Sequence, residues 1–481
     1  METVFKNQIE SSPDIKQDKT SAFRGNNVFL FYIMSLVAFS VILLTIGVVN
    51  QSHSVLLLLT IIYWAVATLP VLFMRVTWIT PLFFQMFYEI PKVLSLAYRA
   101  TSVYNIQRKW ITMIPYDDVI HAYIKCIIIT CIGLLIEYFI MLRINVRTKG
   151  IRIELEKNRK PLFLLGIAGI AFFLLMRDLG GLSYVLGNYQ SRLTEFSEDT
   201  NIYYRYLIYW GIIPCLFFYL TDDRFLFIVT LLINVLFLLA IGERGGLVSS
   251  LGLSLLVVAQ LKKRRKIRIL KALMVALVFI LAYQIIGSIR DTKESEYGSS
   301  FSLSNETLLD RGVDALGDIQ HFVISSELIY MIDSHYIDHT WGAPLLNIIF
   351  APIPRKLFPW KPTYIAESAL VGSLILDRDT DVYGLPPSVF SYGYLNFGWI
   401  GVILFSVICG LYMKWFYSVF ILKYLDKGEA IPNGNVILYT LTVGYAYVII
   451  STEAQTKMII TLIGFCLLFI MTRGKGEPDH E

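Results

Sequence analysis

Residues 225–261 have the sequence FLFIVTLLINVLFLLAIGERGGLVSSLGLSLLVVAQL, and their only charged side chains are Glu243 and Arg244. An apolar helix of about 20 residues can cross the roughly 30 Å hydrocarbon layer of a membrane. This stretch is too long for one crossing, and an arginine at mid-bilayer costs at least about 2.5–3.5 kcal/mol. We therefore expect two transmembrane helices joined at residues 242–246 (GERGG), where the glycines allow a turn and a close approach to a ligand.

The composition of the whole chain is that of a membrane protein. Its 481 residues are 56% hydrophobic and 16% charged, with a mean hydropathy of +0.60, whereas soluble domains contain about 25% charged residues. This excludes a water-soluble enzyme. A net charge of +5, from 42 basic and 37 acidic residues, builds no continuous basic face and excludes a nucleic-acid binder. The five cysteines form no CxxC pair, so no disulfide framework or zinc site is indicated, and we expect no metal and no cofactor.

Apolar runs long enough to span a membrane recur along the chain, and we count about twelve. They lie at about 28–49, 55–74, 79–98, 119–142, 161–176, 203–220, 225–241, 246–261, 269–287, 399–420, 436–450 and 458–471. The third is the weakest, because Glu89, Pro91 and Lys92 interrupt it. The expected fold is an all-α polytopic membrane protein, with one transmembrane domain over residues 28–472 and polar tails at 1–27 and 473–481.

Basic residues predict the orientation of these spans, since cytoplasmic connections are rich in lysine and arginine. Lysines and arginines crowd the connections after the fourth and eighth spans, at 143–160 and 262–271. Both connections are even-numbered and so face the same side, together with the short turn at 222–224 and both termini. We therefore expect cytoplasmic termini and two larger extracytoplasmic segments, at about 177–202 and 288–398.

The segment 288–398 is acidic and too long for a simple connection, which indicates a functional insertion. Apolar residues recur at helical spacing over 305–332, with acidic residues between them, so we expect a helix lying on the membrane surface. Four prolines break the apolar run 341–360. We expect this run to form a re-entrant or interfacial hairpin rather than a span.

Cations in the outer segments suggest a site for an anionic ligand. In residues 352–362 (PIPRKLFPWKP) the prolines preset a backbone that carries Arg355, Lys356 and Lys361. Such a set suits a diphosphate, because arginine binds phosphate oxygens bidentately; interfacial anchoring is the alternative. Arg244 at the elbow fits the same role, or forms a hairpin-tip ion pair with Glu243. Outward arginines near a membrane need an anionic partner, and the others are Arg177, Arg192 and Arg290.

A reaction with a hydroxyl nucleophile at such a site would need a base. His321 lies within the expected helix at 305–332, and a neutral imidazole can accept a proton there; a solvated histidine is the alternative. Three carboxylates are further candidates for the base: Asp310, Asp314 and Glu367. His335 and His339 are four residues apart, but a metal site needs a third ligand that the sequence does not offer. The acidic stretch 377–381 fits a divalent cation or a solvated loop tip.

These residues resemble the O-antigen polysaccharide polymerases of the Wzy type, the oligosaccharide repeat unit polymerases. Four motifs carry the resemblance: Gly180-Gly181-Leu182-Ser183-Tyr184 with Arg192, Gly242 to Gly246, Pro354-Arg355 to Lys361-Pro362, and Gly393-Tyr394-Leu395-Asn396-Phe397-Gly398. Relatives often carry a glutamate four residues before that asparagine, where this chain has Tyr392. In this chain the role of that carboxylate passes to another group such as Glu367, or it is not catalytic.

The resemblance implies a fold similar to GT-C-type glycosyltransferases and an active site on the outer face of a bacterial inner membrane. The growing O-antigen, capsule or exopolysaccharide would be transferred from undecaprenyl diphosphate to an incoming lipid-linked repeat unit. His321, Arg244 and Arg355 would be catalytic. The cations that would bind the diphosphate are Arg192, Arg244, Arg290, Arg355 and Lys361. The expected partners are the undecaprenyl-diphosphate-linked oligosaccharide, membrane lipid and, as an option, a chain-length regulator, with no nucleic acid.

Two other functions fit the same pattern of spans. A flippase or transporter of lipid-linked oligosaccharides commonly has about twelve spans, but its two halves carry matched broken helices, which the sequence does not show. An O-antigen ligase shares the arginine at the elbow and the large outer segment but transfers finished polymer to another acceptor. The sequence alone leaves both alternatives open.

Overall fold

The computed structural model describes residues 20–49, 53–73, 81–100, 115–144, 151–181, 201–241, 250–252, 254–263, 319–343, 345, 371, 374–375, 387–427, 429–443 and 452–472. Within these ranges the structure contains helices and no strand, which confirms the all-α class. The helices are α2 (Thr20–Val49), α3 (Ser54–Thr68), η1 (Leu69–Phe73), α4 (Pro81–Ala100), α6 (Tyr116–Arg143), α7 (Leu162–Asp178), α10 (Asn201–Ile208), η2 (Tyr209–Gly211), α11 (Ile212–Leu220), α12 (Arg224–Ala240), α13 (Ser254–Lys263), α16 (Ile319–Asp333), α19 (Val389–Tyr417), η6 (Ser418–Leu422), α20 (Lys423–Asp426), α21 (Asn433–Val443) and α22 (Thr452–Thr472).

The helices have the length and composition of a helical membrane protein. Among the described residues, three stretches are long and apolar enough to cross a membrane, namely Ser54–Leu72, Tyr116–Arg143 and Val389–Asp426. Shorter apolar helices lie at Tyr32–Thr45, Arg224–Ala240, Ser250–Lys262 and Met458–Thr472. The expected span at 269–287 lies outside the described residues, as do the elbow at 242–246 and most of the expected hairpin at 341–360.

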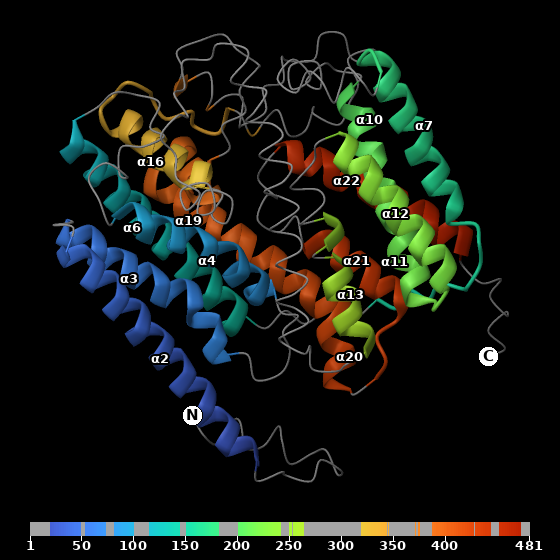
Figure 1. Cartoon of the computed structure of the whole chain (residues 1–481), viewed down its shortest axis with the longest axis horizontal. Helices are drawn as coiled ribbons and strands as arrows, with labels where there is room; N and C mark the ends of the chain where they lie inside the picture. Colours follow the sequence, from blue (N-terminus) through green and yellow to red (C-terminus); the bar gives the residue numbers. More distant parts are fainter. Residues whose placement is uncertain are drawn as a thin grey trace.

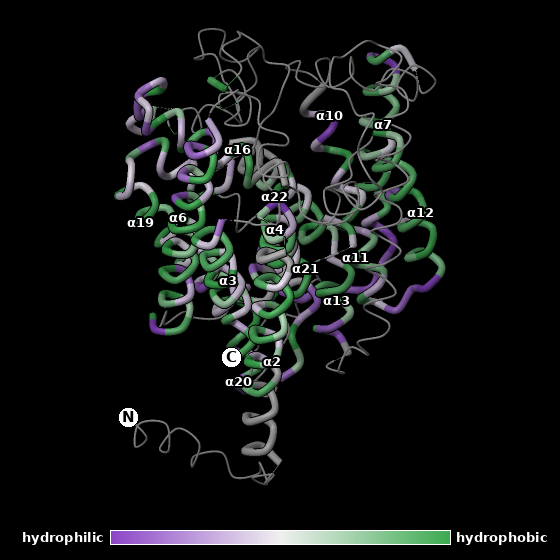
Figure 2. The backbone as a smooth tube through the Cα atoms, turned by 60° about the vertical axis from the view of Figure 1, so that its left-hand side comes forward, coloured by the Kyte–Doolittle hydropathy of each residue, from purple (hydrophilic) through white to green (hydrophobic). Residues whose placement is uncertain are grey.

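Hydrophobic residues predominate along most of the described helices (Figure 2). On α12 the exposed side chains recur every three to four residues, at Phe225, Ile228, Leu232 and Leu236, whereas Thr230 and Asn234 are buried. The Asn234 side-chain amide donates to the carbonyls of Gly211 and Thr230 at 2.8 and 2.7 Å. A helix in a membrane has this arrangement, because lipid accepts an apolar surface while a polar group needs a partner inside the protein.

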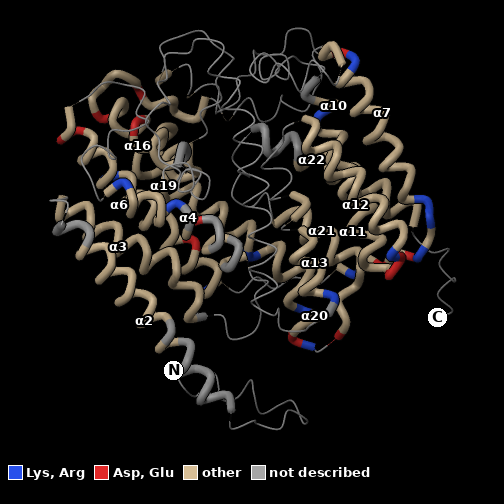
Figure 3. The backbone as a smooth tube through the Cα atoms, viewed as in Figure 1, with Lys and Arg blue, Asp and Glu red and all other residues tan. Residues whose placement is uncertain are grey.

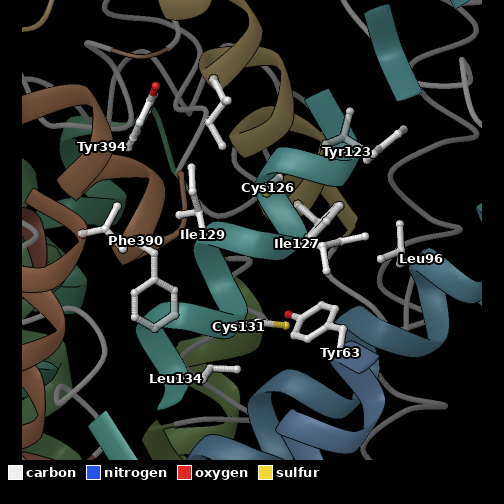
Figure 4. Packing of buried hydrophobic residues seen from close by; sticks show 14 of the residues in the cluster. Tyr63, Leu96, Tyr123, Cys126, Ile127, Ile129, Cys131, Leu134, Phe390 and Tyr394 are labelled. Carbon is white, nitrogen blue, oxygen red and sulfur yellow. The ribbon is translucent and has the colours of Figure 1, made fainter. Parts of the chain in front are cut away.

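The helices form two bundles that α19 connects (Figure 1). The first bundle contains α2, α3, α4, α6, α16 and most of α19, and the second contains α7, α10 to α13 and α20 to α22. In the first bundle α6 packs against α19, and Gly133 of α6 lies so close to the Phe390 ring that a Cβ at this position would overlap it. Figure 4 shows the neighbouring part of this core, where Cys131 of α6 points toward Tyr63 of α3.

Helix α16 is an interior helix of the first bundle. The prediction of a membrane-surface helix at 305–332 was wrong over 319–332, the part of that range that the structure describes. Residues 322–329 are all buried, and α16 packs against α4, α6 and α19. The Phe322 ring stacks on Tyr123 with centroids 5.7 Å apart. The Ser326 hydroxyl donates to the Phe322 carbonyl at 2.9 Å, so its polarity is satisfied within the helix. A surface helix would keep one face toward water, and α16 has none over these residues.

Most charged residues lie near the ends of the helices (Figure 3), but charged residues of α4, α6 and α16 are buried in the first bundle. At one end of the molecule, contacts join connections that are far apart in the sequence: Lys262 Nζ with Asp222 Oδ1 at 2.7 Å, Glu156 N with Thr472 O at 2.9 Å, and Gly434 N with Ile153 O at 3.1 Å. All of these connections are on the predicted cytoplasmic side. These contacts bring each pair of connections together.

Candidate functional site

Helix α19 is broken at the motif that the sequence singled out, residues 393–398. Phe397 has non-helical dihedrals, and Gly398 has φ 58° and ψ −141°, a conformation open essentially to glycine alone. Gly393 and Gly401 would lie about 12 Å apart in a continuous helix. Here their backbones touch, because a Cβ on Gly401 would overlap the Gly393 carbonyl oxygen. The glycines of this motif therefore permit a sharp turn of the chain.

The asparagine of the motif anchors this turn to the segment after α16. Asn396 is fully buried, accepts from the Thr340 hydroxyl at 3.0 Å and donates to the Tyr392 carbonyl at 2.9 Å. Tyr392 is buried, and its ring centroid lies 6.0 Å from that of Phe405. Both residues are structural, and the carboxylate beside this motif belongs to Asp333.

Three side chains from three helices meet at the amino-terminal end of α19, and we refer to Lys125, Asp333 and Tyr394 as the Lys125 cluster. The Lys125 ammonium lies 2.7 and 2.6 Å from the two Asp333 carboxylate oxygens and donates to the Tyr394 hydroxyl at 2.8 Å. The Tyr394 hydroxyl in turn donates to Asp333 at 2.8 Å. The side chains of Lys125 and Asp333 are 28% and 36% exposed, so a ligand can reach this cluster.

His339 lies beside the Lys125 cluster. Its ring is 5.7 Å from that of Tyr394 and 5.9 Å from that of Trp341, and Nδ1 is 3.3 Å from the Leu395 carbonyl oxygen. A carbonyl only accepts hydrogen bonds, so this contact favours the tautomer with the proton on Nδ1. Nε2 of the neutral ring is then an acceptor, which is what a general base requires.

A row of polar side chains on α4 lies in the interior of the first bundle. Gln85, Glu89, Lys92 and Arg99 recur at heptad-like spacing and are all buried. Glu89 accepts from the Tyr63 hydroxyl at 2.5 Å and pairs with Lys92 at 2.8 Å. In the sequence, Glu89 and Lys92 only weakened the prediction of the third span. Their position inside a predicted span could have identified them, because ionisable residues within a span are candidates for function.

Most of the predicted site residues lie outside the described residues. This holds for the predicted diphosphate ligands Arg192, Arg244, Arg290, Arg355 and Lys361 and for the predicted bases Asp310, Asp314 and Glu367. His321 lies in the first turn of α16, and its side chain is not described. It precedes Asp333 by twelve residues, which is about 18 Å along a helix axis. His321 and the Lys125 cluster are thus at opposite ends of α16.

The predicted outer segment at about 177–202 begins at the end of α7, where Gly180 and Gly181 terminate the helix. Gly181 N donates to the Met176 carbonyl and Gly180 N to the Arg177 carbonyl, at 2.7 and 3.2 Å, and both glycines have positive φ. This is a Schellman motif that closes α7. The Arg177 guanidinium donates twice to Asp178, at 3.0 and 2.8 Å. Arg177 therefore has its anionic partner in this chain.

None of the protein-family models matches the chain, and no curated protein and no solved structure is significantly similar to it. The family resemblance therefore rests on the short motifs. Within the described residues, Gly180, Gly181, Gly393 and Gly398 have roles in the backbone, so these positions specify local structure. No group of three or more histidine, cysteine or acidic side chains that suits a metal occurs in the same part of the chain. The site is defined by the Lys125 cluster and His339.

Proposed function

We propose that the protein polymerises lipid-linked oligosaccharide repeat units on the outer face of a bacterial inner membrane. The growing glycan leaves undecaprenyl diphosphate and is transferred to the terminal sugar of an incoming unit. A bond forms between the anomeric carbon and the acceptor hydroxyl, the bond from that carbon to the diphosphate breaks, and the hydroxyl proton passes to a base. The product is an O-antigen, a capsule or an exopolysaccharide.

The observation that carries this proposal is the ion pair between Asp333 and Lys125. Asp333 belongs to the proposed outer segment 288–398, and the pair holds the end of α16 against α6 at 2.6 Å. His339 follows six residues later and lies beside Tyr394. Glycosyl transfer between two membrane-anchored substrates needs a base at a fixed height above the bilayer, because a displacement of about 1 Å can lower the rate about 10²-fold. The ion pair supplies that fixation.

His339 is the proposed base, in preference to His321. Its Nδ1 contact with the Leu395 carbonyl at 3.3 Å leaves Nε2 to accept the acceptor hydroxyl proton. Asp333 is a weaker candidate, because Lys125 and Tyr394 already occupy its oxygens. Arg192, Arg244, Arg290, Arg355 and Lys361 are the proposed ligands of the departing diphosphate, whose developing charge they would stabilise.

The proposed topology has about 12 spans, cytoplasmic termini and a fold similar to GT-C-type glycosyltransferases. Its support is the contact of Lys262 with Asp222 at 2.7 Å and of Glu156 N with Thr472 O at 2.9 Å, which join connections rich in basic residues. Among the described helices, α19 is the one with non-helical dihedrals in its interior. Transporters with inverted repeats carry such breaks in matched positions of both halves, which favours a polymerase over a flippase.

The deciding experiment is deletion of the gene followed by electrophoresis of the surface polysaccharide. We expect single repeat units on the surface acceptor and restoration of long chains by the wild-type gene. Polymer stranded on its lipid carrier would indicate a ligase instead, and repeat units trapped on the inner face would indicate a flippase. In vitro, the purified protein in lipid vesicles should lengthen undecaprenyl-diphosphate-linked repeat units without any other enzyme.

A further inference from the structure

The buried carboxyl, lysine and arginine side chains of the described residues all lie in the first bundle. They are Glu89, Lys92 and Arg99 of α4, Glu137 of α6 and Glu327 of α16, each at most 8% exposed. Two are cations and three are carboxyls. An unbalanced charge in an apolar interior is costly, and a buried group neutralises rather than remain alone. The charges of these five described residues balance when one of the three carboxyls carries a proton.

The partners of the three carboxyls single out Glu137. Glu89 pairs with Lys92 at 2.8 Å and accepts from the Tyr63 hydroxyl at 2.5 Å, and Glu327 has interactions of its own. Glu137 is fully buried, and its one hydrogen bond comes from the Gln85 side-chain amide to Oε2. It has no ion pair with any described cation.

Two oxygen atoms of this pair have no hydrogen-bond partner. Glu137 Oε1 and Gln85 Oε1 are both buried without a donor among the described residues, while Gln85 Nε2 donates to Glu137 Oε2. A buried acceptor without a donor loses its hydration, at a cost of about 1–3 kcal/mol. One proton on Glu137 Oε1 could donate to Gln85 Oε1 and so satisfy both atoms. A carboxylic acid and a primary amide joined by two parallel hydrogen bonds form this kind of pair.

We propose that Glu137 is a proton-binding site in the membrane interior, where the neutral carboxylic acid pairs with the Gln85 amide. The groups around it support this assignment. Glu89 and Lys92 of α4 act electrostatically on Glu137, and Tyr138 of α6 and Cys409 of α19 are close enough for a charge on Glu137 to act on them. Lys92 is already neutralised by Glu89, so an ionised Glu137 would face a neutral pair. The proton exchanges with bulk water and no other reactant is needed.

The test is infrared spectroscopy of the full-length protein in lipid at neutral pH, comparing the wild type with Glu137→Gln. Gln is isosteric and its amide can keep both hydrogen bonds with Gln85, so this variant should fold. We expect it to lose the C=O stretch of one neutral carboxylic acid, a band that shifts in D₂O. The matched variant Glu327→Gln should keep this band. Loss of a carboxylate band in Glu137→Gln instead would overturn the proposal.

A second measurement needs no variant. Hydrophobic carbodiimides modify protonated carboxyls in membranes, and mass spectrometry of the digested wild-type protein locates the adduct. We expect an adduct on the peptide that contains Glu137 and none on the peptide that contains Glu89. Modification of Glu89 alone would show that the proton resides there and would overturn the assignment. Neither measurement depends on polysaccharide synthesis, so this inference and the proposed function are tested separately.

Discussion

Lys125 and Asp333 are 208 positions apart in the chain, yet the Lys125 ammonium lies 2.7 and 2.6 Å from the two Asp333 carboxylate oxygens. Tyr394 completes the contact by accepting from Lys125 and donating to Asp333, both at 2.8 Å. The three residues join α6, α16 and α19. Helix α16 lies in the interior of the first bundle and ends at Asp333. The contact with Lys125 and Tyr394 therefore fixes the position of this end of α16.

Asp333→Asn should weaken this junction without unfolding the protein. The pair is partly exposed, so we expect the free energy of unfolding to fall by about 1 kcal/mol. Thermal unfolding in lipid nanodiscs measures the change. The exchange of charges in Lys125→Asp with Asp333→Lys should recover part of the loss, because the ion pair is re-formed in the opposite sense. Equal stability of wild type and Asp333→Asn would contradict a contribution from the pair.

His339→Ala should abolish chain elongation and His335→Ala should leave it intact. His339 lies against Leu395 O and Tyr394, whereas His335 is exposed. Loss of a general base lowers a rate by about 10²–10⁴-fold, so the His339 variant should leave mostly single repeat units. The length distribution of lipid-linked glycan made in vesicles is the measurement. Long chains from His339→Ala would remove this residue from the proposed mechanism.

Arg244→Ala and Arg355→Ala should each give the single-repeat pattern while the protein still inserts into the membrane. Both are proposed to stabilise the negative charge that develops on the leaving diphosphate. Arg177→Ala is the matched control, because Arg177 is already paired with Asp178. Complementation of a deletion strain, with immunoblots for insertion, checks the three variants. Full-length chains from either Arg244→Ala or Arg355→Ala would end the assignment of that residue.

The fold was predictable where a local pattern decides it. The apolar run 225–241 is long enough to form α12 whatever surrounds it, so its helix follows from sequence. The environment of α16 could not be predicted from the sequence. The spacing of its apolar residues is the same whether its other face contacts water or neighbouring helices. The Lys125 cluster was not predictable, since it depends on contacts over 208 and 61 positions that leave no local signal. Asn396 was predicted to matter, and its buried hydrogen bonds show a structural role.

Gly133→Leu should destabilise the first bundle. A Cβ at Gly133 would overlap the Phe390 ring, whereas a Cβ at Gly166 on α7 has nothing within 4 Å. Overpacking a close-packed interior costs about 1–3 kcal/mol, so we expect a lower unfolding temperature for Gly133→Leu and little change for Gly166→Leu. Circular dichroism during heating in detergent compares the two. Equal effects of both substitutions would show that α6 and α19 tolerate separation at this point.

Lys262→Ala should raise the pKa of Asp222. A hydrogen bond from the Lys262 ammonium holds the pKa of this carboxyl below its ordinary value. Burial opposes this effect, and the charges of Lys262, Lys157 and Arg224 add to it. The pair therefore favours the folded state above the ordinary pKa of an aspartate, about 3.9, and this contribution is lost as the pH falls through the lowered value.

The Asp222 side chain is 80% exposed, so solvent screens the interaction and the stability change should be small. The pKa is the better measurement, by NMR titration of labelled aspartate side chains in micelles. Lys427→Ala removes the same charge from a different pair, with Glu429 at 3.9 Å, and should leave Asp222 unchanged. An unchanged pKa in Lys262→Ala would mean that α13 does not lie against the turn before α12. The basic connection at 262–271 would then lose the contact that places it beside the turn at 222–224.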